Sequence, residues 1–192
     1  ARKCAMGRMA IPAIGSTPKI TIKNEHVYGG VRIQELSWQL PYGRPTEALV
    51  LRPLNAAGKL PAVLAFHDHG GNKYFGKAKI TRASDPQQPL IKAHQNEYYE
   101  GVAWANEIAK RGYVVLVPDA FLFGSRRVML QDVPEHLRNG FNDNDPENLV
   151  NIEKYNQWAA QHEHVMAKSF VQRRDYMAGR SLCRGPNGPG CV

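Results

Sequence analysis

One segment, Pro61-Ala-Val-Leu-Ala-Phe-His-Asp-His-Gly-Gly71, constrains the fold more than any other part of the chain. Its short apolar run at 62–66 predicts a buried strand, because strands of a parallel sheet are covered on both faces. The run ends at two histidines, an aspartate and two glycines. Paired glycines permit a sharp turn with backbone N–H groups pointing into a crevice, and open α/β sheets bind ligands at that end of their strands. The segment therefore predicts a sheet strand that leads into a functional turn.

Composition indicates a globular protein and narrows its partners. Of the 192 residues, 43% are hydrophobic and 22% are charged, and the net charge is +8. The basic residues are scattered and do not alternate with aromatic ones, so we expect no nucleic-acid partner. No stretch approaches the ~18 apolar residues of a membrane span, and the N-terminus lacks the apolar centre of a signal peptide. We therefore expect a cytoplasmic protein with no membrane partner.

Motifs for cofactors are missing from the sequence. The three cysteines lie near the two ends and form no C-x-x-C pair, which favours reduced thiols over a disulfide or a zinc site. No G-x-G-x-x-G or Walker pattern occurs, so nucleotide binding has no support. We expect a chain without a cofactor.

Periodicity predicts an α/β chain whose antiparallel strands come first. Residues alternate in three hairpin-linked segments, 19–23, 31–40 and 46–52. After an irregular connection at 72–96, helical spacing predicts a helix at 98–111, and a second buried strand follows at 113–117. Strand 62–66, this helix and strand 113–117 form one right-handed, parallel βαβ unit. We expect about six strands in the sheet.

The remainder of the chain divides into a loop, a helix and a tail. Residues 120–145 form a long polar loop, and such loops are usually lids or binding loops. Apolar residues at helical intervals predict a helix at 146–169 that begins with a proline. The tail, residues 170–192, is basic, rich in Gly and Pro, and without strand or helix period. We therefore predict a domain over 1–169 and an irregular tail.

Six stretches carry a resemblance to a known family: LSWQLPYG at 36–43, HDHGGNKYFG at 67–76, WAN at 104–106, RGYVVL at 111–116, DAFLFGSRR at 119–127 and HEHVMAKS at 162–169. In this order they resemble the α/β-hydrolase superfamily, and within it the dienelactone-hydrolase and acetyl-xylan-esterase-like group. The resemblance implies an incomplete α/β-hydrolase sheet, with N-terminal antiparallel strands, one parallel βαβ unit and a C-terminal helix. It also implies a serine carboxylic-ester hydrolase that acts on a small-molecule ester.

The resemblance ends at Ser169. The family would continue with a Thr-Thr-Trp-Pro-Gly segment and a strand that carries a G-x-S-x-G nucleophile elbow, followed by the catalytic acid and histidine. None of these follows here, and the near match Gly179-Arg-Ser-Leu-Cys183 ends in cysteine and has no strand before it. Ser181 is therefore a weak candidate nucleophile. The chain is interpreted as the N-terminal half of an esterase, inactive or weak by itself.

The resemblance assigns roles to two loops. Backbone N–H groups of the turn at 69–71 would stabilise a tetrahedral oxyanion. The loop after strand 113–117 faces the same crevice, where an arginine can bind an anionic group. Ser125, in this loop, is a second weak candidate nucleophile. The residues assigned to the oxyanion and substrate sites are His67, Asp68, His69, Gly70, Gly71, Asn72, Ser125 and Arg126.

Other interpretations of these residues stay open. The His67-Asp-His69 turn could form part of a metal site in a metal-dependent hydrolase, although the further histidines at 162 and 164 are two apart on a helix and do not share a face. It could also be a hydrogen-bonded structural turn. The arginines at 126 and 127 could pair with acids such as Asp119 or Asp132 instead of substrate. His94 and His136 are expected on the surface.

A sheet without its nucleophile strand would have an unusual edge. In the resembled fold, strand 62–66 lies between strand 113–117 and the nucleophile strand. Without that neighbour it becomes an exposed apolar edge, which is a template for pairing. We therefore expect a homo-oligomer through strand 62–66, or a tail folded over it. A non-catalytic, self-associating fragment is the alternative function.

The tail predicts a frameshift that DNA sequencing can detect. Codons read one base later from Phe170 permit L-F-S-G-G-T-T-W-P-G-V-L-F-A-E-D, and the Trp is forced because Met177 precedes an Ala codon. We expect the coding DNA to hold this frame open and to lead into a serine elbow. Early stop codons in the shifted frame, with no serine elbow, would contradict the frameshift.

Overall fold

The computed structural model describes residues 17–40 and 44–161. The chain divides into two units, of which one is Pro18–Ala160 and the other combines Ala1–Thr17 with Gln161–Val192. Nearly all the described residues belong to the first unit. The predicted boundary between 169 and 170 lies outside the described residues. In the part that is described, no helix has the length and apolar character to cross a membrane.

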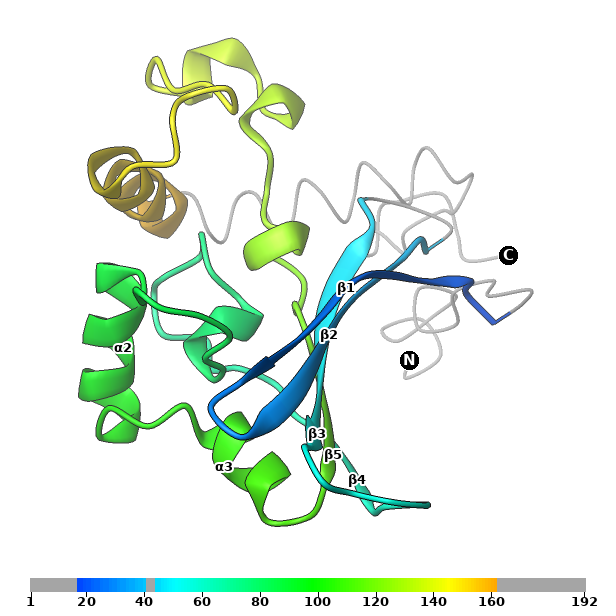
Figure 1. Ribbon diagram of the computed structural model, residues 1–192. Helices are drawn as coiled ribbons and strands as arrows, with labels where there is room; N and C mark the ends of the chain where they lie inside the picture. Colours follow the sequence, from blue (N-terminus) through cyan, green and yellow to red (C-terminus); the bar gives the residue numbers. More distant parts are fainter. Residues whose placement is uncertain (1–16, 41–43, 162–192) are drawn as a thin grey trace, which may run out of the picture. The chain divides into compact units, whose positions relative to one another are not determined.

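A mixed β-sheet organises the first unit (Figure 1). Its strands are β1 (Ile20–Tyr28), β2 (Val31–Trp38), β3 (Thr46–Pro53), β4 (Ala62–Leu64) and β5 (Val114–Pro118). Across the sheet the order is β1-β2-β3-β5-β4, and all neighbours are antiparallel except the parallel pair β4 and β5. This confirms the antiparallel start and the parallel pair. The described residues form five strands instead of about six.

Two helices join β4 to β5, where one was predicted. They are α2 (Pro89–Tyr99) and α3 (Trp104–Lys110). A continuous helix over 98–111 was wrong because Glu100 and Gly101 have φ values of 55° and 79°. Left-handed backbone of this kind ends a right-handed helix.

The start of α2 lies inside the stretch that was predicted to be irregular. Pro89 occupies the first helical position, where its missing N–H is harmless. The side-chain oxygen of Gln88 accepts hydrogen bonds from the N–H groups of Leu90 (2.6 Å) and Ile91 (3.1 Å). This cap satisfies donors that the helix itself leaves unpaired.

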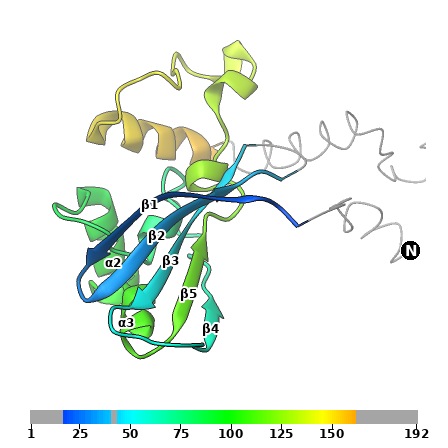
Figure 2. The same ribbon diagram turned by 45° about the vertical axis from the view of Figure 1, so that its right-hand side comes forward.

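The hydrophobic core lies between the sheet and α3, which packs on β2, β3 and β5 (Figure 2). Alternate residues of the strands point into it, as a period of two requires. Its buried members are Val31, Ile33, Leu49, Leu51, Ala65, Ile80, Ala105, Ala109, Val115 and Val117. The core thus fixes the strands whose carboxyl ends carry the candidate site.

Strand β4 lies at an edge of the sheet. It pairs with β5 on one side, and Leu64 and Phe66 expose 57% and 56% of their surface. The prediction that 62–66 is buried on both faces was therefore wrong; only Ala65 in this run is buried. The expectation of an exposed apolar edge is confirmed for the described residues.

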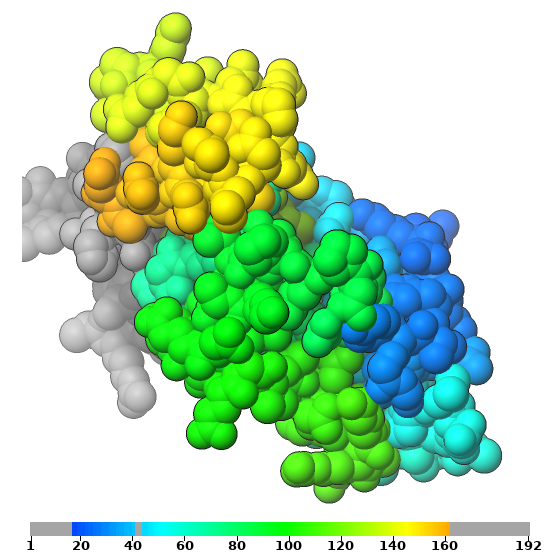
Figure 3. Space-filling view, turned by 60° about the vertical axis from the view of Figure 1, so that its left-hand side comes forward, coloured from blue at the N-terminus to red at the C-terminus, as the bar shows by residue number. Residues whose placement is uncertain are grey.

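The long loop after β5 contains three single 3-10 turns, η2 (Gly124–Arg126), η3 (Leu130–Asp132) and η4 (Glu135–Leu137). Residues 149–161 are then helical, three residues later than predicted, and the predicted end at 169 lies outside the described range. The Trp158 ring N–H donates to the carbonyl of Leu137 (2.7 Å), and the Tyr155 hydroxyl donates to that of Val128 (2.8 Å). The loop and the helix form one continuous block in Figure 3.

Truncation of Leu51 tests the core. Its side chain is fully buried, so we expect Leu51→Ala to lower the free energy of unfolding by about 2–5 kcal/mol. Leu54 is 40% exposed, so Leu54→Ala should cost less than about 1 kcal/mol. Urea unfolding followed by circular dichroism measures both, and equal losses would contradict the core described above.

Candidate functional site

Two loops meet at the carboxyl ends of β4 and β5. We call residues 67–72 the glycine turn and residues 119–127 the β5 loop. The backbone N–H of Ala120 donates to the Nε2 of His67 (3.1 Å). Directly after the turn, the carbonyl of Lys73 accepts from the N–H of Gly124 (3.2 Å). The structure therefore brings together the two loops that were predicted to share a crevice.

The hydrogen bonds of His67 fix its protonation state. Its Nδ1 lies 3.0 Å from the carbonyl oxygen of Asp68, and its Nε2 faces the Ala120 N–H. A carbonyl accepts and an amide donates, so the ring is the neutral Nδ1–H tautomer. Burial also lowers the pKa of His67, which favours the neutral form. Both ring nitrogens are engaged, so His67 is poorly placed to bind a metal or to transfer protons.

The metal interpretation gains no further ligands. No three His, Cys, Asp or Glu side chains of the described ranges come together in a way that could hold a metal ion. The histidines at 162 and 164, which were considered as partners, lie outside those ranges. What the structure shows at His67 and Asp68 is a set of hydrogen bonds within the turn and to its neighbours.

Asp68 ties the glycine turn to α2. Its Oδ2 accepts from the Nε2 of His94 (3.0 Å) and from the hydroxyl of Tyr99, and its Oδ1 lies 3.7 Å from the ammonium of Lys79. Burial by itself raises the pKa of Asp68, but these two hydrogen bonds and the Lys79 charge outweigh it and lower the pKa. His94 is buried, so its prediction as a surface histidine was wrong. The error follows from the missed helix.

A buried lysine supports the turn from beneath. Lys79, in the 3-10 turn η1 (Lys77–Lys79), is fully buried, and its ammonium donates to the carbonyls of Asp68 (3.4 Å) and His69 (3.3 Å). The same group lies 4.5 Å from the centre of the Phe123 ring. A trans peptide directs its C=O and N–H to opposite sides. The His69 carbonyl points toward the Lys79 ammonium. The N–H of Gly70, which belongs to the same peptide, therefore points away from Lys79.

Two glycines form the tip of the turn. A Cβ at Gly70 would overlap the carboxylate of Asp68 and crowd the ring of His94, and Gly71 has a φ of +58°. Both positions therefore require glycine. No described residue accepts a hydrogen bond from the N–H of Gly70 or Gly71. These two donors are what an anion at the turn would meet.

Asp119 anchors the β5 loop. Its buried carboxylate accepts from the N–H of Lys77 (2.6 Å), from the Lys77 ammonium (2.9 Å) and from the N–H of Ser125 (2.9 Å). The alternative that the arginines of this loop pair with Asp119 was wrong, because Lys77 takes that place. Arg126 donates to the hydroxyl of Thr46 (2.7 Å), and Arg127 lies 4.3 Å above the Tyr74 ring.

The remaining predicted residues have structural contacts. The Ser125 hydroxyl accepts from the N–H of Glu47 (2.9 Å), and no described histidine hydrogen-bonds to it. A nucleophilic serine needs an adjacent base, so this position does not favour nucleophilic attack. Asn72 accepts from the side chain of Asn156 (2.7 Å) in the last helix, while His69 lies 3.0 Å from the ammonium of Lys73. Ser181 lies outside the described residues.

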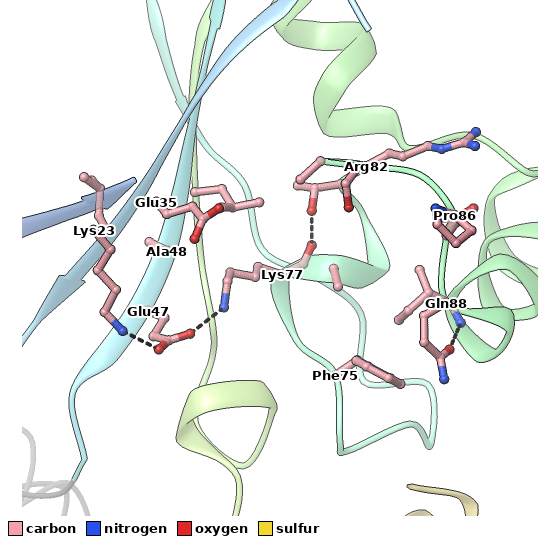
Figure 4. Close-up of a pocket in the computed structure, with 17 residues that line it drawn as sticks. Lys23, Glu35, Glu47, Ala48, Phe75, Lys77, Arg82, Pro86 and Gln88 are labelled. Atoms are coloured by element: carbon pink, nitrogen blue, oxygen red, sulfur yellow. Dashed lines mark hydrogen bonds and ion pairs between the residues drawn. The ribbon is translucent and has the colours of Figure 1, made fainter. Parts of the chain in front are cut away.

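A cavity of about 430 Å³ lies apart from the glycine turn, between strands β1–β3 and residues 75–91 (Figure 4). Glu47 at its wall pairs with Lys23 (2.6 Å) and Lys77 (3.2 Å). Burial raises the pKa of Glu47, but the hydrogen bonds and charges of both lysines outweigh it, so the pKa is lowered. Lys77 also pairs with Asp119, and it connects this cavity to the β5 loop.

Comparison with known proteins adds little to this geometry. No family model and no curated protein matches the chain. A solved structure that is similar is a candidate acetyl xylan esterase from Bacteroides fragilis NCTC 9343, with 20% identity and a TM-score of 0.45. The match covers 65% of this chain and 30% of that chain, so this chain spans less than a third of that structure. A likeness of this size carries no argument about activity.

Sequence reasoning missed the residues that support the glycine turn. Lys79 belongs to the connection at 72–96 that was predicted to be irregular, and Tyr99 lies in the helix predicted at 98–111, to which no site residue was assigned. The sequence held one signal for Lys79, which is the apolar residue Ile80 next to it. The structure shows that Ile80 is fully buried. An apolar residue next to a lysine does not reveal which of the two is covered.

The pH dependence of stability tests the burial of Lys79. Burial lowers its pKa from 10.5 to about 8. Below pH 8 the lysine is charged in both states and the burial cost is complete; between 8 and 10.5 the unfolded state holds more protons, so this cost fades as the pH rises. We expect wild type to gain up to about 3 kcal/mol relative to Lys79→Met over this range. Urea unfolding at both ends measures it. The exposed Lys59, changed to Met, should show no such difference.

Proposed function

We propose that this chain supplies the oxyanion turn of a serine carboxylic-ester hydrolase and forms the N-terminal part of that enzyme. The observation that carries the proposal is the pair of N–H groups of Gly70 and Gly71, which have no acceptor among the described residues. The turn follows a parallel strand at its carboxyl end, where α/β sheets bind ligands. The sequence motifs of the esterase group support the same assignment.

The chemistry divides between this chain and a nucleophile strand. A serine outside the described residues would attack the ester carbonyl carbon, and negative charge would develop on the carbonyl oxygen. The N–H groups of Gly70 and Gly71 would donate to that oxygen and stabilise the charge. Water would then hydrolyse the acyl-enzyme. In this scheme the neutral His67 and the ionised Asp68 hold the turn in shape and do not react.

Lys79 would prepare the turn before substrate arrives. Donors aimed in advance at a developing charge need no reorganisation during the reaction, and that is the main advantage of an oxyanion site. The ammonium already holds the carbonyls of Asp68 and His69, so the direction of the next N–H is set without a ligand. Its buried positive charge also favours a negative charge at the turn.

A covalent probe tests whether this chain has a reactive serine of its own. We expect no adduct after treatment with a fluorophosphonate, and no hydrolysis of p-nitrophenyl acetate above that of the urea-unfolded chain. The reason is that the Ser125 hydroxyl accepts a hydrogen bond from the backbone N–H of Glu47 and has no histidine base among the described residues. Intact mass spectrometry measures the adduct and also checks the tail. A stoichiometric adduct that maps to Ser125 or Ser181 would overturn the proposed division of roles.

A further inference from the structure

The two edges of the sheet differ in how they are protected against pairing. Edge strand β1 carries Lys23 and Glu25, and its ladder with β2 shifts register between Ile22 and Asn24. Charges and bulges are the devices that prevent edge strands from pairing with other chains. The other edge, β4, lies within residues 60–67, which contain no Asp, Glu, Lys or Arg, and its ladder with β5 is regular. Only one of the two edges is therefore protected.

The unprotected edge presents free backbone groups together with apolar side chains. The carbonyl of Pro61 accepts from the Val114 N–H, and the N–H of Ala65 donates to the Leu116 carbonyl, both at 2.9 Å. Backbone groups alternate in direction along a strand, so the N–H and C=O of Leu64 face away from β5. The side chain of Leu64 is 57% exposed. At Leu64, the backbone groups can therefore hydrogen-bond to a neighbouring strand, and the side chain can pack against it.

We propose that two copies of this chain pair through β4, antiparallel, about a twofold axis at Leu64. This register places Leu64 opposite its own copy and Ala62 opposite Phe66 of the second copy, so that a small side chain faces a large one. The outward backbone groups of Leu64 then bond reciprocally, as a twofold contact requires. The exposed side chains of Leu64 and Phe66 in one copy would pack against β4 of the other copy. This inference does not depend on the proposed hydrolase function.

Charge favours this contact over other surfaces. Each copy carries a net charge of +8, so a contact that placed cations of the two copies opposite each other would add to their repulsion. The uncharged stretch at 60–67 meets that condition. At its ends, the register brings Lys59 of one copy within one residue of Asp68 of the other, so opposite charges are close and like charges are not opposed.

A second copy fits the edge better than the tail of the same chain. Residues 170–192 have no alternating pattern and contain two prolines and four glycines. Proline cannot donate to a ladder, and glycine weakens a strand. A second copy instead brings a strand that is already formed, apolar and uncharged.

Sedimentation velocity of the full chain over a wide concentration range tests the proposal. We expect wild type to be dimeric and Leu64→Lys to be monomeric, because the new charges would face each other across the axis. Val150, on the helix at 149–161, is 56% exposed, and Val150→Lys is the matched control that should stay dimeric. Circular dichroism confirms that both variants fold. A monomeric wild type, or a dimer that Leu64→Lys leaves intact, would overturn the proposal.

A cysteine at the axis gives an independent test that does not rely on a disruptive charge. The three native cysteines, Cys4, Cys183 and Cys191, are first replaced by serine. Leu64→Cys should then form a covalent dimer under mild oxidation, because facing residues of a hydrogen-bonded antiparallel pair have Cα atoms about 5.5 Å apart, within disulfide range. Val150→Cys should not. Equal cross-linking of the two variants would contradict the twofold register at Leu64.

Discussion

The candidate site depends on the hydrogen bonds that the buried carboxylate of Asp119 accepts. Asp119 ends β5 and holds both the backbone and the ammonium of Lys77, as well as the backbone of Ser125. A Cβ at Gly76 or Gly124 would run into this carboxylate, so both neighbouring segments can approach it only as glycine. A buried charge is costly unless it is paired and hydrogen-bonded. Asp119 satisfies this requirement, and in doing so it fixes the segments on either side of the glycine turn.

A second buried charge performs a related task for the glycine turn itself. Lys79 lies under the turn, and the Asp68 carboxylate, two carbonyls and the face of Phe123 offset its charge. The lowered pKa shows that this compensation is incomplete. Strongly perturbed groups of this kind gather at functional sites, because a buried charge that serves only stability is easily replaced by an apolar side chain. The position of Lys79 beneath two free N–H groups is consistent with that tendency.

The sequence was sufficient for strands β2, β3 and β5 and for the meeting of the two loops that follow β4 and β5. Alternation of apolar residues and buried runs identify β2, β3 and β5, and the topology of a parallel pair then brings His67 close to Ala120. The sequence was insufficient for α2. Its buried face includes His94 and Gln95, which bond to Asp68 and to the carbonyls of Ala78, Lys79 and Thr81. A helix that buries polar groups gives no hydrophobic period, so its contacts to the turn were missed as well.

The strand β4 shows a different limit of sequence reasoning. An apolar, uncharged run such as 62–66 is typical of a strand with neighbours on both sides, yet here it has one neighbour in the described residues. The apolar pattern indicates that the strand needs a neighbour on each side, but it does not identify the second neighbour. In the proposed dimer, strand β4 of a second copy would meet this requirement. Because the glycine turn follows β4 directly, whichever strand covers this edge also lies beside the candidate oxyanion site.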